Sequence, residues 1–95
     1  MVIDKLKRIF ITHFPDGRVE RLNTTTVPVY EFISFHTDLI VYMTEDDDDH
    51  DSMLCEVKGN TNDVDGFYDA SVVGYIDTTA EFKRLMKGLS LRIDQ

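Results

Sequence analysis

At the centre of the chain stands the stretch LIVYMTEDDDDHDSMLCEVK, residues 39–58, in which an acidic run separates two apolar segments. The run, Glu45–Asp51, holds six acidic residues in seven positions. Residues 39–44 are rich in aliphatic and aromatic side chains, and residues 53–58 alternate in character. Both patterns are typical of β-strands. We therefore expect two strands of an antiparallel sheet here, with the acidic run between them.

The segments at the N-terminus also have the composition of strands. Residues 6–14 alternate in character and are rich in Ile and Phe, which predicts a strand buried on both faces at its centre. Pro15-Asp16-Gly17 is a turn sequence, because proline presets φ and glycine can take positive φ. Residues 18–23 then return as a second strand, so we expect an N-terminal hairpin.

The segment 27–36 fits two structures. Val29, Ile33 and Ile40 lie at near-helical spacing, and Pro28 is compatible with a helix start. The density of β-branched and aromatic residues favours a strand instead. We expect a strand that turns at residues 36–38 into the central segment.

The C-terminal part changes its period. Residues 67–76 alternate and predict a further strand, after which Thr78 and Glu81 have the spacing of a helix capping box. Apolar residues then recur at helical spacing: Phe82, Leu85, Met86, Leu89 and Ile93. The predicted fold, for a single domain spanning residues 1–95, is therefore α+β. It is a small antiparallel sheet of about five to six strands, in hairpins or a meander, packed by one C-terminal amphipathic helix.

Charge is unevenly distributed along the sequence. The formal net charge of the chain is −8, with +2 in residues 1–22, −12 in residues 23–77 and +2 in residues 78–95. A phosphate backbone is held by lysine and arginine, so this pattern disfavours direct binding of nucleic acid, and anionic membranes are disfavoured for the same reason. A basic partner fits better. A single cysteine, no signal-peptide pattern and no long apolar run predict a cytoplasmic protein.

In extended conformation, the acidic run has a linear charge density comparable with that of one nucleic-acid strand. An extended chain places a side chain about every 3.3 Å, and one strand of B-DNA places a phosphate about every 3.4 Å. A charge run can equally be a solvated loop without a partner, but the acidic residues around it favour a binding surface. The candidate partner-binding residues are Glu45, Asp46, Asp47, Asp48, Asp49, Asp51, Asp63, Asp65 and Asp69.

Metal binding and catalysis find little support in the sequence. Residues 61–66 resemble part of a calcium loop, but Thr61 and Val72 occupy the positions where its first and last carboxylates belong. The histidines have no zinc-site spacing, Cys55 is compatible with a place in the core, and no nucleophile or phosphate-loop motif is present. We expect neither enzymatic activity nor a cofactor or metal.

Aromatic residues concentrate in the same acidic segment of the chain. Most are expected to fill the core, but one or two tyrosines can serve as exposed anchors beside carboxylates, a favourable surface for binding arginines. Periodicity alone does not separate the two groups. An exposed edge strand can also pair with a second copy, so a homodimer is compatible with the sequence.

In size, charge and lack of motifs the chain resembles a class of phage- or mobile-element-encoded inhibitors that mimic DNA. These act against restriction enzymes, CRISPR effectors, nucleoid proteins or polymerases. The resemblance implies a host-defence antagonist that occupies the basic nucleic-acid-binding surface of a host protein. Two alternatives are an immunity- or antitoxin-like partner that caps a toxin, and a small calcium-binding module.

Overall fold

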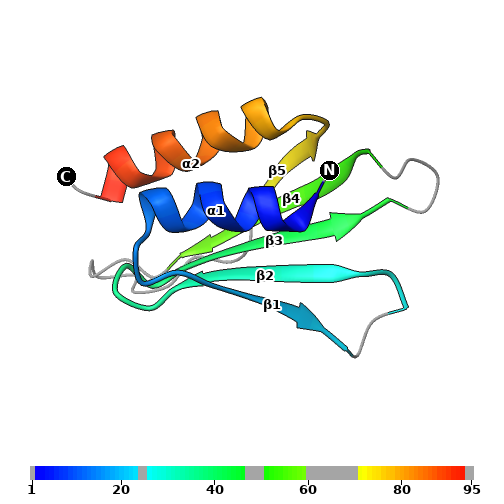
Figure 1. Cartoon of the computed structure of the whole chain (residues 1–95), viewed down its shortest axis with the longest axis horizontal. Helices are drawn as coiled ribbons and strands as arrows, with labels where there is room; N and C mark the ends of the chain where they lie inside the picture. The colour runs from blue at the N-terminus through cyan, green and yellow to red at the C-terminus, as the bar shows by residue number, and fades with distance from the viewer. Residues whose placement is uncertain (1, 24–25, 47–50, 60–70, 94–95) are drawn as a thin grey trace.

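The fold joins one antiparallel sheet to two helices (Figure 1). A computed structural model of the chain describes residues 2–23, 26–46, 51–59 and 71–93. In chain order the elements are α1 (Ile3–His13), β1 (Arg18–Leu22), β2 (Val29–Ser34), β3 (Leu39–Glu45), β4 (Met53–Gly59), β5 (Ser71–Ile76) and α2 (Thr79–Ile93).

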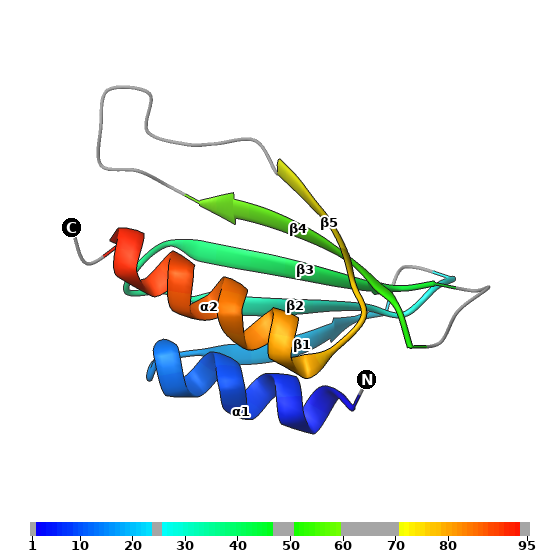
Figure 2. The same cartoon turned by 90° about the horizontal axis from the view of Figure 1, so that it is seen from above.

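The sheet is a meander in which each strand pairs antiparallel with the next, in the order β1-β2-β3-β4-β5. Both helices lie side by side over the same face, which we call the covered face (Figures 1 and 2). The predicted α+β class and antiparallel sheet are confirmed, and residues 29–34 of the ambiguous segment form a strand. Strands β1 and β5 are the edges of the sheet.

The predicted N-terminal strand over residues 6–14 is wrong, because residues 6–13 belong to helix α1 and Phe14 is its C-cap. Leu6 and Phe10 are fully buried and Phe14 nearly so, and a spacing of four residues fits a strand face and a helix face equally well. Ile3 and Ile9 also pack against the core, which only the helical period explains. The expected N-terminal hairpin is thus a helix–turn–strand unit, and the sheet is covered by two helices rather than one.

The predicted C-terminal helix and its cap are confirmed. Thr78 Oγ1 accepts a hydrogen bond from the Glu81 backbone N–H at 3.2 Å and donates one to Glu81 Oε1 at 3.3 Å. The first of these bonds satisfies a backbone N–H that the first helical turn otherwise leaves without a partner, and the second joins the two side chains. Gly88 does not end the helix, which continues to Ile93.

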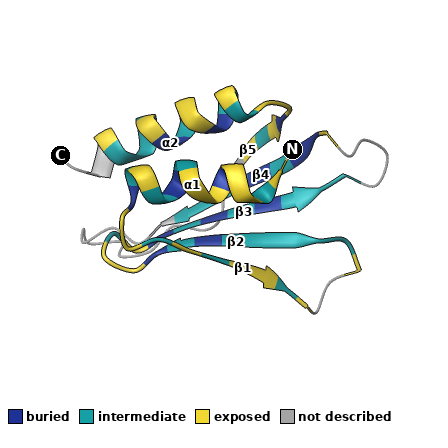
Figure 3. Ribbon diagram, viewed as in Figure 1, coloured by how far each residue is buried: buried dark blue, intermediate teal, exposed yellow. Residues whose placement is uncertain are grey.

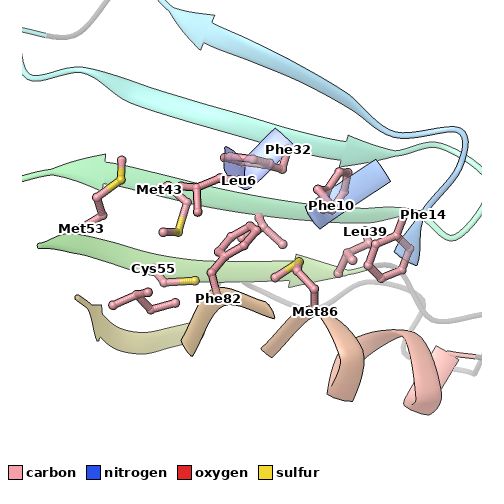
Figure 4. Packing of buried hydrophobic residues seen from close by; sticks show 12 residues of the cluster. Leu6, Phe10, Phe14, Phe32, Leu39, Met43, Met53, Cys55, Phe82 and Met86 are labelled. Atoms are coloured by element: carbon pink, nitrogen blue, oxygen red, sulfur yellow. The ribbon is translucent and has the colours of Figure 1, made fainter. Parts of the chain in front are cut away.

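The core lies between the covered face and the two helices (Figures 3 and 4). Phe32 of β2 sits between the helices: its ring centroid lies 5.5 Å from that of Phe10 on α1 and 5.4 Å from that of Phe82 on α2. The buried apolar residues are Leu6, Phe10, Phe14, Phe32, Leu39, Val41, Met43, Met53, Cys55, Ile76, Phe82 and Met86.

A polar network joins the turn after α1 to the turn between β2 and β3. Asp16 accepts hydrogen bonds from the Ser34 hydroxyl and the His36 backbone N–H, both at 2.8 Å. The bond from His36, with that from Ser34, holds the pKa of Asp16 below its ordinary value despite some desolvation. Gly17 completes the turn, since a Cβ there would lie 2.7 Å from the Phe10 ring. The predicted turns over residues 15–17 and 36–38 are confirmed.

Candidate protein-binding surface

The sheet has a second face, the open face, over which neither of the described helices lies (Figure 2). Residues paired across neighbouring strands share a face, and the partners of Phe32, Val41 and Cys55 belong to the covered one. The intervening residues of each strand therefore point to the open face. Because the register is continuous through β1–β4, these residues form rows that run across the strands.

The pairing defines a row that we call the apolar row. Its members are Leu22, Val29, Thr44, Leu54 and Tyr75, one from each strand. Tyr75 is 59% exposed, and the other four are partly exposed. Large apolar side chains at neighbouring positions on an uncovered face are the kind of surface that another molecule can bury.

The next row is acidic, and we call it the acidic row. It consists of Glu20, Glu31, Tyr42 and Glu56 on β1–β4, so Tyr42 lies between two carboxylates. Burial raises the pKa of Tyr42, as do the negative charge of Glu31, a hydrogen bond from the tyrosine hydroxyl to Glu31, and the charge of Glu56. The phenol is therefore held in its protonated form. A tyrosine between carboxylates has the mixed character favoured where arginine is bound.

A third row on the same face carries positive rather than negative charge. It contains Arg18, Ile33, Ile40 and Lys58, with a base at each end. Arg18 Nη2 lies 3.2 Å from Glu20 Oε1, and the guanidinium stacks 4.8 Å above the centre of the Phe35 ring. This exposed pair partly neutralises both the base and the Glu20 end of the acidic row. The open face thus grades from bases, through the acidic row, to the apolar row.

The β3–β4 hairpin end lies beyond the apolar row and carries the described part of the acidic run. Glu45 ends β3 opposite Met53, and the Asp46 backbone N–H bonds the Ser52 carbonyl at 3.4 Å. The Ser52 hydroxyl donates a hydrogen bond to Asp77, which fixes this end against the start of α2. Glu45, Asp46 and Asp51 are therefore brought to one end of the sheet. The other candidate residues lie outside the described residues: Asp47, Asp48, Asp49, Asp63, Asp65 and Asp69.

Opposite charges occupy the two layers of the fold. Among the described residues, the helices hold seven bases against two acids, a net charge of +5, whereas the sheet and its connections hold three bases against nine acids, a net charge of −6. Exposed bases on the helices are Lys5, Lys7, Arg8, Lys83, Arg84 and Lys87. The described acids of the acidic segment thus lie on the sheet and its connections.

Sequence reasoning had not assigned the apolar row to a surface. The strands were recognisable from their composition, but Leu22, Val29 and Leu54 are as apolar as core residues. The two faces can be told apart only from the strand register and the positions of both helices. The sequence had predicted α2 but not α1. Of the tyrosines left undecided, Tyr42 and Tyr75 lie on the open face.

The described residues were also searched for a metal site and for a reactive cysteine. Within residues 2–23, 26–46, 51–59 and 71–93, no group of three His, Cys, Asp or Glu side chains is placed to hold a metal ion. The partial calcium loop at residues 61–66 lies outside this set. Cys55 is fully buried, and burial raises the pKa of its thiol to about 12, which leaves it protonated at neutral pH.

In the described part of the chain, no helix combines the length and apolar character needed to cross a membrane.

Comparison with known families, curated proteins and solved structures found no match to any of the three.

Proposed function

We propose that the chain is a non-catalytic acidic protein that binds a basic surface of another protein. The separation of charge between the layers supports this most strongly, with +5 on the helices and −6 on the other described residues. Acidity that served only solubility would require a net charge but no segregation. A one-sided charge instead orients a protein as it approaches a partner of opposite sign.

A nucleic-acid-binding protein is the partner class that fits this surface best. Its lysines and arginines hold phosphates, and carboxylates at comparable spacing neutralise the same cations. Inhibition is then competitive: while the acidic side of this chain occupies the groove, DNA or RNA cannot enter. This is the action of a DNA mimic and of a host-defence antagonist.

A second candidate is an immunity- or antitoxin-like protein that caps a toxin. The observation that favours it is the apolar row beside the acidic row on the open face. Salt separates the two functions. Mimicry through exposed charge weakens steeply as salt rises, because screening acts on exposed charges, whereas a packed apolar interface is much less sensitive.

The test is displacement of a fluorescent DNA duplex from a panel of purified DNA-binding proteins, followed by anisotropy. The protein is expected to displace the duplex from at least one of them at low salt. The triple variant Asp47→Asn, Asp48→Asn, Asp49→Asn should weaken displacement about tenfold or more. A matched control, Asp4→Asn, Asp38→Asn, Asp94→Asn, also changes the net charge from −8 to −5 but leaves the acidic run intact. Equal loss in both variants would mean that only total charge matters, and no displacement from any protein would refute the proposal.

A further inference from the structure

The apolar row is bordered by acids on both of its sides. Along β3, Tyr42 belongs to the acidic row, Thr44 to the apolar row, and Asp46 to the hairpin end, each two residues from the last. Positions two apart in a strand are separated by about 6.6 Å. The apolar row therefore runs between one strip with Glu20, Glu31 and Glu56 and a second, shorter strip at the hairpin end with Asp46 and Asp51. Glu45 is not part of this second strip, because it pairs with the buried Met53 and shares the side of the sheet that the helices cover.

The length of the apolar row suits a short helix. The row crosses all five strands, from Leu22 on β1 to Tyr75 on β5. With strands about 4.8 Å apart, it extends about 19 Å. An α-helix covers that distance in about 13 residues, and its turn of about 5.4 Å nearly matches the strand spacing. Side chains one turn apart on a helix can therefore meet successive strands.

Charge complementarity selects the kind of helix. An amphipathic helix with an apolar stripe bordered by lysines and arginines places cations opposite both acidic strips. The long aliphatic stems of those residues cover apolar surface while the charged ends reach the carboxylates. Packing a helix on an apolar sheet face is also what α1 and α2 do on the covered face.

Neither helix in the described part of the chain supplies this element. The apolar faces of α1 and α2 are already buried through Leu6, Phe10, Phe82 and Met86. A second copy placed open face to open face, with the apolar rows in contact, would bring acidic strips near one another, and like charges at an interface cost free energy.

We propose that the open face of the sheet binds one amphipathic, lysine- and arginine-rich α-helix of a partner protein. The apolar row receives the apolar stripe of the helix, and the two acidic strips receive its cations. This inference rests on the proposed function and adds the docking face and the structural element that docks. It assigns the leading role in affinity to Leu22, Val29, Leu54 and Tyr75 rather than to the acidic run.

The test uses two synthetic peptides of about 14 leucine and lysine residues with the same composition. The first has its leucines on one helical face, and the second has the same residues in scrambled order. Binding to the ¹⁵N-labelled protein is followed by NMR at physiological salt. The patterned peptide should bind about tenfold more tightly than the scrambled one and shift the amide signals of the apolar row most strongly.

A variant of the apolar row and a control at a similarly exposed position sharpen the test. Tyr75→Ser combined with Leu54→Thr should weaken the patterned peptide about tenfold. Leu91→Ser removes an apolar side chain that is 58% exposed on α2, against 59% for Tyr75, and should leave affinity unchanged. Circular dichroism and thermal melting verify that each variant is folded. Equal loss in the variant and its control would overturn the inference.

The remaining outcomes distinguish the inference from the proposed function. If both peptides bind equally and perturb the hairpin end instead of the open face, the inference fails while acidic binding stands. If neither peptide binds even at low salt, both fail. If the apolar-row signals change with protein concentration before peptide is added, the face is occupied by a second copy, which also overturns the inference.

Discussion

The two faces of the sheet are built from the same strands but have different roles. Phe32 and Ile33 are neighbours on β2, yet Phe32 is fully buried beneath two helices while Ile33 faces outward and is only partly buried. The covered face consists of apolar residues that pack with α1 and α2. The open face mixes apolar, acidic and basic rows. Stability is therefore concentrated on the covered face, whereas the proposed binding of a partner is assigned to the open face.

The largest expected effect on stability comes from removing an aromatic ring from the core. Phe32→Ala should lower the free energy of unfolding by about 3–5 kcal/mol, because it leaves a cavity between the Phe10 and Phe82 rings. The adjacent Ile33→Ala should cost about 1 kcal/mol or less, since its side chain is already partly in water. Urea unfolding of both variants measures the difference. Similar losses would mean that the open face contributes to stability as much as the covered one.

An intermediate effect is expected at the next pair of neighbours, on β4. Cys55→Ser places a hydroxyl in the apolar core and should cost about 1–3 kcal/mol, whereas Leu54→Thr on the open face should cost less. The native thiol should also resist alkylation at neutral pH, because it is buried and protonated. Its modification should become rapid only in urea. Fast modification of the folded protein would show that this part of the core opens readily.

The smallest expected effect on stability comes from ionisation of the Tyr42 phenol on the open face. The pKa of Tyr42 is raised above 10.0, so at alkaline pH the unfolded chain loses this proton before the folded protein does. Stability should therefore fall as pH rises above about 10. Glu31→Gln removes a charge and the ionised hydrogen-bond acceptor, so the pKa of Tyr42 should move down towards 10.0 and the fall in stability should lessen. An NMR titration of labelled tyrosine follows the pKa, and Glu81→Gln on α2 is the control. An unchanged Tyr42 titration would contradict the contact with Glu31.

Helix α1 shows why part of the fold escaped sequence reasoning. Leu6, Phe10 and Phe14 are separated by four residues, a spacing that lies on one face of a strand and also on one face of a helix. The β-branched Ile9 and Ile11 then favoured a strand through their local propensity. Tertiary packing outweighed that propensity, because a helix here buries Ile3, Leu6 and Phe10 together against the sheet. The position of Ile3 was the signal in the sequence that indicated a helix.

The candidate site was likewise predictable only in part. Concentration of acids between residues 23 and 77 is visible in the sequence, and the structure describes Glu45, Asp46 and Asp51 of the predicted set. The rows that cross the open face were not predictable. Each row takes one residue from each of several strands, so it exists only once the register is fixed.

The sequence by itself determined the elements whose local signals agree. The density of β-branched, aliphatic and aromatic residues predicted β2 and β3, and alternation predicted β4. The cap at Thr78 and a helical apolar period predicted α2. Only the tertiary structure decided which side of the sheet became the core. Strands with apolar residues on both faces, such as Phe32 beside Ile33 and Cys55 beside Leu54, satisfy either choice by local pattern. The physical reason is that burial depends on what packs against a face, and here two helices cover one face and leave the other open.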